Sequence, residues 1–104
     1  MDERLRARYE RESRRPRTSV IAAIESLGLR PGMRMADVGC GPGAHLGLFA
    51  RHLEPGGEAI GVDLDEDRLV VAGEFHPDLV ARGIVRLQPG DIARLPFDDG
   101  ELDL

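Results

Sequence analysis

Three glycines at alternate positions, 39, 41 and 43, make up the segment of this chain best suited to chemistry. The segment Gly39-Cys-Gly-Pro-Gly43 follows an apolar stretch and precedes residues with helical spacing. Glycines in such a turn adopt backbone angles that other residues avoid, and they let a ligand approach the main chain. The following helix would direct N–H groups and the positive end of its dipole at that ligand. An ordinary strand–helix turn would show the same pattern.

Two acidic residues recur after later apolar stretches. Asp63 ends the second stretch, and Asp91 follows the third one behind a Pro89-Gly90 turn. Because the carboxyl ends of parallel strands meet at one edge of a sheet, both acids would lie near the glycine loop. Asp63 could accept hydrogen bonds from the two ribose hydroxyls of a nucleoside, and Asp91 could hold the exocyclic amine of adenine. The plainer alternatives are a surface acid for Asp63 and a turn or cap acid for Asp91.

The elements that position these residues alternate between strand and helix. Apolar stretches predict strands over 33–38, 59–63 and 84–87, with the opening of a fourth at 102–104. Helical spacing predicts a helix capped by Thr18 or Ser19, another over 46–53, and one capped by Asp65 that bends at His76-Pro77. This alternation predicts an α/β fold of three layers, α/β/α, around a parallel sheet. A sheet of three strands and the start of a fourth would leave an edge uncovered, so we expect the natural protein to be longer.

Charge and composition reduce the number of function classes that the chain could belong to. Residues 1–17 hold seven arginines and four acids, a net charge of +3, whereas residues 18–104 carry −8. The alternation of both signs favours a solvated helix or an arm over a neighbouring domain, and disfavours nucleic-acid binding. No long apolar run suits a membrane span and the N-terminus does not fit a secretory signal, so we expect a cytoplasmic location. A single cysteine, Cys40, excludes an internal disulfide and disfavours structural zinc.

Three segments together resemble a known family. Met35–Gly43 (MADVGCGPG), Gly61–Asp65 (GVDLD) and Gly90–Phe97 (GDIARLPF) are similar to the first three cofactor motifs of Rossmann-like methyltransferases that depend on S-adenosyl-L-methionine. The resemblance covers about residues 18–104. Its Leu95-Pro96-Phe97 element and the acids behind it are most similar to the branch that methylates small molecules such as quinones. The resemblance implies a polar N-terminal arm or helix over 1–17 and part of a cofactor-binding methyltransferase domain over 18–104.

The resemblance also implies roles for nine residues, all near the carboxyl ends of the predicted strands: Asp37, Gly39, Cys40, Gly41, Gly43, Asp63, Leu64, Asp91 and Ile92. The first five would surround the methionine portion of the cofactor. Asp63 would bind the ribose hydroxyls, and Leu64 would cover one face of the adenine. Asp91 would meet the adenine amine, with Ile92 against the ring. A small-molecule methyl acceptor is implied, but no catalytic residue and no metal ligand.

Other interpretations stay open. Gly39, Gly41 and Ala44 also fit the looser dinucleotide pattern G-x-G-x-x-A, although Pro42 and Gly43 follow the methyltransferase form. A phosphate-binding P-loop is excluded because the chain has no lysine. The chain could also bind cofactor without catalysis, or complete its sheet with another chain, and a homo-oligomer is compatible with the sequence.

The three histidines and the acids after Asp63 carry weaker signals. His45 could approach a ligand, but a capping or solvent-facing histidine fits better, and His52 and His76 are expected at the surface. The acids at positions 63, 65, 66 and 67 could suggest a metal, yet acids at a helix start more often favour the helix dipole.

Overall fold

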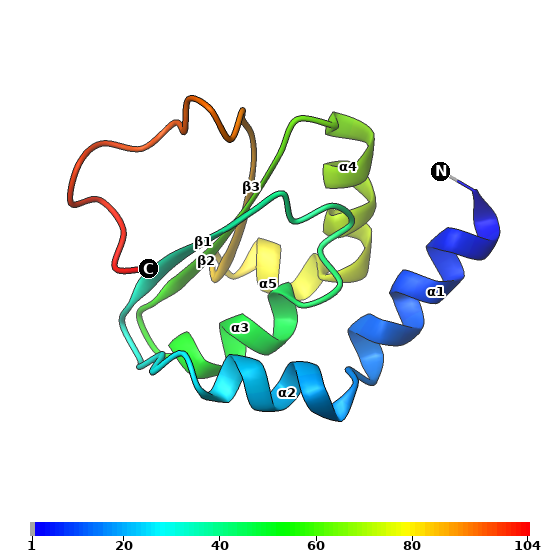
Figure 1. The fold of residues 1–104 in the computed structure, drawn as a ribbon, viewed down its shortest axis with the longest axis horizontal. Coiled ribbons are helices and arrows are strands. Elements are labelled where there is room, and N and C mark those ends of the chain that lie inside the picture. Colours follow the sequence, from blue (N-terminus) through cyan, green and yellow to red (C-terminus); the bar gives the residue numbers. More distant parts are fainter. Residues whose placement is uncertain (1) are drawn as a thin grey trace.

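A parallel sheet organises the chain in this computed structural model, which describes residues 2–104 (Figure 1). Its strands are β1 (Arg34–Val38), β2 (Glu58–Asp63) and β3 (Val85–Pro89), and β2 lies between the other two. The register pairs Val38 with Val62, and Asp63 with Pro89. The carboxyl ends of all three strands therefore lie side by side, and the loops that follow the strands meet there.

Five helices are present within residues 2–104: α1 (Glu3–Arg14), α2 (Thr18–Glu25), α3 (Leu46–Leu53), α4 (Glu66–Phe75) and α5 (Pro77–Ala81). None of these is long and apolar enough to cross a bilayer. The division into an arm over 1–17 and a domain from residue 18 stays a prediction. Figure 1 shows α1 beyond the end of α2, beside the helices that pack on the sheet.

Of the two helix caps predicted from the sequence, one is confirmed and one is wrong. Asp65 caps α4, because its side chain accepts a hydrogen bond from the Asp67 amide, as predicted. The predicted cap of α2 by Thr18 or Ser19 is wrong. Arg17 occupies the cap position, with no side-chain cap bond, and Thr18 is already the first helical residue. The preceding Pro16 and the extended backbone at Arg17 bring the chain into the helix one residue earlier.

One face of the sheet carries the apolar core. Side chains alternate between the faces of a strand, so register neighbours share a face. Met35, Ala59 and Val85 lie side by side on that face, and each is at most 3% exposed. The residues that α3 packs against them are Leu46, Ala50 and Leu53. Burying each of these two leucines contributes about 2 kcal/mol, which fixes α3 and therefore the loop that leads into it.

The last residues return to the free edge of β1. The amide of Leu104 donates to the Arg34 carbonyl at 3.3 Å, and the Leu104 carbonyl accepts from the Ala36 amide at 3.1 Å. These two bonds flank Met35 in the pattern of a parallel ladder. Residues 102–104, where the sequence predicts the opening of a fourth strand, thus bond to β1 on the side opposite β2 but form no strand of their own. A strand in this position would reverse the strand order at β1, and open α/β sheets bind their ligands at such a reversal.

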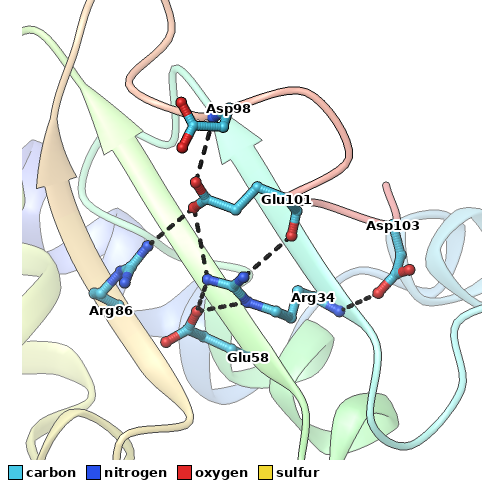
Figure 2. Close-up of polar contacts among 6 residues, drawn as sticks. All are labelled: Arg34, Glu58, Arg86, Asp98, Glu101 and Asp103. Atoms are coloured by element: carbon cyan, nitrogen blue, oxygen red, sulfur yellow. Dashed lines mark hydrogen bonds and ion pairs between the residues drawn. The ribbon is translucent and has the colours of Figure 1, made fainter.

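Arg34 holds this returning segment in place (Figure 2). Its guanidinium contacts the Glu58 carboxylate through Nη2 at 3.1 Å and donates from Nη1 to the Glu101 carbonyl at 3.1 Å. Its backbone amide donates to the Asp103 carboxylate at 2.8 Å. Arg86 reaches Glu101 only at 4.0 Å. Arg34 is thus bonded both to β2 and to the segment that pairs with β1.

Replacing Arg34 with methionine is expected to loosen the returning segment, because Met keeps the apolar stem and the backbone amide but removes the guanidinium donors that bind Glu58 and Glu101. We expect the Asp103 and Leu104 amides to exchange their hydrogens about 5- to 30-fold faster, equivalent to about 1–2 kcal/mol. Hydrogen exchange followed by NMR measures this. The matched variant Arg86→Met should leave both rates within about twofold because its ion pair is long and exposed. Equal effects of the two substitutions would refute the assignment.

Candidate functional site

The glycine loop combines open space on one side with tight packing on the other. Gly39, Gly41 and Gly43 all have positive φ angles, of 74°, 58° and 69°. A Cβ placed on Gly39 or Gly41 would meet no described atom within 4 Å. A Cβ on Gly43 would lie 2.8 Å from Leu46 Cδ1 and 2.9 Å from Ala72 Cβ. The first two glycines therefore leave room for a ligand, and the third lets the loop pack against α3 and α4.

Asp63 joins the glycine loop to the loops after β2 and β3. Its side chain is almost fully buried, at 8% exposure. One carboxylate oxygen accepts from the Gly41 amide and the other from the Asp65 amide, both at 2.8 Å. Its backbone carbonyl accepts from the Gly90 amide at 3.1 Å. The predicted proximity of Asp63 to the glycine loop is thus present. Each carboxylate oxygen keeps a lone pair for a further hydrogen bond.

Most amides of the glycine loop are occupied inside the chain. The amides of Gly39 and Cys40 both donate to the Val62 carbonyl, at 2.7 and 3.0 Å. The Gly41 amide binds Asp63, and that of Gly43 donates to the Cys40 carbonyl at 3.1 Å. The amides of Gly39, Cys40 and Gly41 hold the loop onto β2, and that of Gly43 closes a turn within the loop. What Gly39 and Gly41 offer a ligand is therefore room beside the backbone rather than free donors.

The space bordered by the loops after β1, β2 and β3 is called the crevice from here on: its inner end is the β1 side, with Asp37 and Cys40, and its outer end is the side of Leu64 and Asp91. The surroundings of Asp37 and Cys40 disfavour negative charge. Burial raises the pKa of the Asp37 carboxyl, and the neighbouring His45 opposes that rise. Burial, with the charges of Asp37 and Asp63, raises the pKa of the Cys40 thiol to about 12. The thiol is therefore protonated at neutral pH, which rules out a ready nucleophile. Its Sγ donates to the Gly41 carbonyl at 3.3 Å.

Two apolar side chains after β2 and β3 are left uncovered by the described residues, and the first of them, Leu64, lines a hollow at the outer end of the crevice. Leu64 is 70% exposed and Ile92 is 74% exposed. Asp91 is exposed too, and its carboxylate accepts a hydrogen bond from the Ala93 amide at 2.9 Å. An open hollow of about 550 Å³ is lined by Leu64, Asp65, Glu66, Asp67, Pro89, Gly90 and Asp91. The predicted pair Leu64 and Asp91 therefore shares one hollow, next to the buried Asp63.

The N-terminal helix contacts His45, the cap residue between the glycine loop and α3, which the sequence did not specify. Glu12 of α1 lies 3.1 Å from His45 Nε2, and the same oxygen accepts from the Arg17 amide at 3.3 Å. The hydrogen bond with His45 lowers the pKa of Glu12; burial opposes it, and Arg17 adds to the lowering. His45 thus faces α1 and a hollow of about 350 Å³ that is also lined by Tyr9.

The expected surface position of His76 is wrong. The residue is 8% exposed, and its Nε2 lies 2.8 Å from the Gly43 carbonyl oxygen. His52 is half-buried in α3. The sequence held one unused signal for His76: a residue directly before a proline is disfavoured in the helical conformation, so its side chain need not continue the exposed face of α4.

The comparisons with known proteins agree with this geometry. The family model of the methyltransferase domain matches residues 35–104, so the chain belongs to the methyltransferase domain family. The chain is 38% identical over 80 residues to an uncharacterized 37.1 kDa protein in transposon TN4556 of Streptomyces fradiae, covering 77% of this chain and 22% of that protein. It is 35% identical over 82 residues to a demethylmenaquinone methyltransferase of Desulfitobacterium hafniense, covering 78% of this chain and 32% of that enzyme.

The fold has solved counterparts. A SAM-dependent methyltransferase from Aquifex aeolicus superposes with a TM-score of 0.70 and 24% identity, covering 79% of this chain and 43% of that one. The likeness confirms the predicted Rossmann-like α/β fold with its parallel sheet. The chain spans about a fifth to a third of the length of the two curated relatives.

Asp63 is expected to stabilise the fold in the absence of ligand. Asp63→Ala removes the acceptor for two backbone amides, and we expect it to lower the free energy of unfolding by about 2–4 kcal/mol. Asp63→Asn keeps one acceptor oxygen and should lose about half as much. Urea unfolding followed by circular dichroism measures both. The exposed Asp78→Ala on α5 serves as control and should stay within about 0.5 kcal/mol of wild type. Equal stability of the alanine and asparagine variants would argue against this role.

Asp37→Asn is expected to stabilise the ligand-free chain at neutral pH. Because the folded-state pKa of Asp37 lies above its ordinary value of 3.8, its favourable contribution is complete below that value and is lost as the pH rises through the folded pKa. The asparagine variant should therefore unfold at higher urea concentration than wild type at pH 7, with a difference that shrinks below pH 3.8. The exposed Asp99→Asn is the control. A variant less stable than wild type at pH 7 would contradict the burial argument.

Proposed function

We propose that this chain forms the cofactor-binding part of an S-adenosyl-L-methionine-dependent methyltransferase. The observation that carries the proposal is the buried Asp63 carboxylate, bonded to Gly41 and adjoining the hollow of Leu64 and Asp91. An adenosyl ligand needs this combination, because it presents a vicinal diol between an apolar ring and a charged tail. Membership of the methyltransferase domain family and the likeness to a SAM-dependent enzyme support the same ligand.

We assign the methionine portion to the inner end of the crevice. Its ammonium group needs acceptors, and the carboxylate of Asp37 lies there in surroundings where burial raises its pKa. A cationic ligand would relieve that burial because an opposite charge favours the ionised carboxyl. Gly39 and Gly41, which carry no Cβ into the open space, would let the chain of the ligand pass close to the backbone.

The ribose and adenine are assigned to the outer end. The remaining lone pairs of Asp63 suit the ribose hydroxyls, and the exposed Leu64 and Ile92 suit the faces of an aromatic ring. Covering two exposed apolar side chains is favourable by about 25 cal/mol for each Å² removed from water. Asp91, in the same hollow as Leu64, would accept from the exocyclic amine.

The reaction proposed for the whole protein is methyl transfer to a small molecule. The bound cofactor supplies an electrophilic methyl group on a sulfonium, so the residues of this chain bind it, orient it and shield it from water. No residue described here is assigned a proton-transfer step. A quinone-like acceptor is supported by the demethylmenaquinone methyltransferase among the relatives and by the Leu95-Pro96-Phe97 element.

Titration calorimetry with S-adenosylhomocysteine tests the proposal directly. We expect saturable binding, and we expect Leu64→Ser and Ile92→Ser each to weaken it about 5- to 30-fold, equivalent to about 1–2 kcal/mol of lost apolar contact. Both side chains are exposed, so the free energy of unfolding should change by less than about 0.5 kcal/mol.

Val70→Ser on α4 is the matched control, since Val70 is 62% exposed and lies outside the hollow of Leu64 and Asp91. Its affinity should equal that of wild type. NADH provides the counter-test for the dinucleotide interpretation, which rests on Gly39, Gly41 and Ala44. Binding of NADH without binding of S-adenosylhomocysteine would replace the proposed cofactor.

A further inference from the structure

A buried histidine outside the predicted motifs contacts the glycine loop. His76 is 8% exposed, and its Nε2 lies 2.8 Å from the carbonyl oxygen of Gly43. A carbonyl oxygen only accepts, so Nε2 carries the proton and donates. The same oxygen also accepts from the Leu46 amide at 3.2 Å. The peptide between Gly43 and Ala44 is thus fixed from two sides.

The local sequence brings the imidazole to this position. His76 ends α4 with φ −132° and ψ 49°, and Pro77 begins α5 directly behind it. Phe75 stands edge-on to the imidazole with ring centroids 6.5 Å apart. The break between the two helices therefore turns one side chain from the end of α4 toward the glycine loop.

A glycine in α3 provides the room for this ring. A Cβ on Gly47 would lie 3.2 Å from Cε1 and 3.3 Å from Nδ1 of His76. Glycine within a helix costs about 0.5–1 kcal/mol relative to alanine. The glycine in α3 stands where the imidazole packs against the helix, so the position of the His76 ring depends on the absence of a side chain at Gly47.

The contact also fixes the direction of the amide that follows the Gly43 carbonyl. In a planar trans peptide the carbonyl and the following N–H point in opposite directions. Because His76 holds the Gly43 carbonyl on the α4 side, the Ala44 amide is directed away from α4. Ala44 lines the hollow that also contains His45 and Tyr9. The orientation of the last peptide of the loop, and of its N–H group, therefore depends on His76.

We propose that His76 is a positioning residue for the cofactor: it holds the Gly43–Ala44 peptide so that the glycine loop keeps the conformation that binds the methionine end of the ligand. This inference rests on the proposed function for the ligand. The conformational part, that the imidazole N–H fixes the Gly43–Ala44 peptide, applies to the ligand-free chain as well.

Substitutions that separate the N–H donor from the bulk of the ring test the proposal. His76→Leu fills a similar space without a donor, and we expect it to weaken S-adenosylhomocysteine binding about tenfold in calorimetry. His76→Gln restores a donor N–H and should bind within about threefold of wild type. Gly47→Ala pushes on the ring with His76 intact and should weaken binding in the same direction as His76→Leu. His52→Leu, in the same helix as Gly47, is the control and should leave affinity unchanged.

Amide resonances of the ligand-free chain give a second, independent result. We expect the ¹H–¹⁵N signals of Gly43 and Ala44 to move in His76→Leu and to return toward wild type in His76→Gln. Equal affinity of His76→Leu and wild type, or equal weakness of the leucine and glutamine variants, overturns the proposal. If wild type itself does not bind S-adenosylhomocysteine, the proposed function fails. The Gly43 and Ala44 signals then decide the conformational part, and unchanged signals in His76→Leu refute it.

Discussion

The hydrogen bond from the Gly41 amide to the buried Asp63 carboxylate is the constraint on which the rest of the candidate site depends. It closes the glycine loop over the end of β2, and the Asp63 carbonyl holds Gly90 at the end of β3. A charged acceptor makes such a bond about twice as strong as a neutral one. One residue thereby connects the three loops that form the crevice. A ligand that bonds to Asp63 would meet an arrangement already assembled, so little binding energy would be lost in ordering it.

The crevice offers a ligand space beside a fixed backbone rather than free hydrogen-bond donors, because two of its glycines carry no Cβ and most loop amides are already bonded. Gly39 and Gly41 leave open space where other residues would place a Cβ, whereas Gly43 lets the loop sink against Leu46 and Ala72. The core on the opposite side holds α3 rigidly through the fully buried Leu46 and Leu53. Apolar packing on one side of the loop therefore holds the backbone that leaves open space on its other side.

The sequence predicted the elements and the meeting of Asp63 with the glycine loop, because both follow from short-range patterns and from the parallel sheet. Apolar stretches placed the strands within two residues, and Asp65 capped α4 as expected. The contact of His76 with Gly43 spans 33 residues, as does that of Glu12 with His45, and no local pattern encodes either pairing. The sequence also did not predict that the loop amides donate to the Val62 carbonyl. The spacing of the glycines indicates the backbone angles of the loop, but it does not indicate which acceptors the loop amides bind.

If Asp37 binds the cofactor as proposed, its placement sets binding against stability. Burial raises the pKa of its carboxyl, so the ionised form costs the folded chain free energy at neutral pH. Such a cost persists where a site uses the charge, and a bound cation removes it. Cofactor and fold are then linked: a cationic ligand stabilises the folded chain by its own binding free energy and also relieves a buried charge. Residues 18–104 together carry a net charge of −8, and this negative charge attracts a positively charged ligand and repels an anionic dinucleotide.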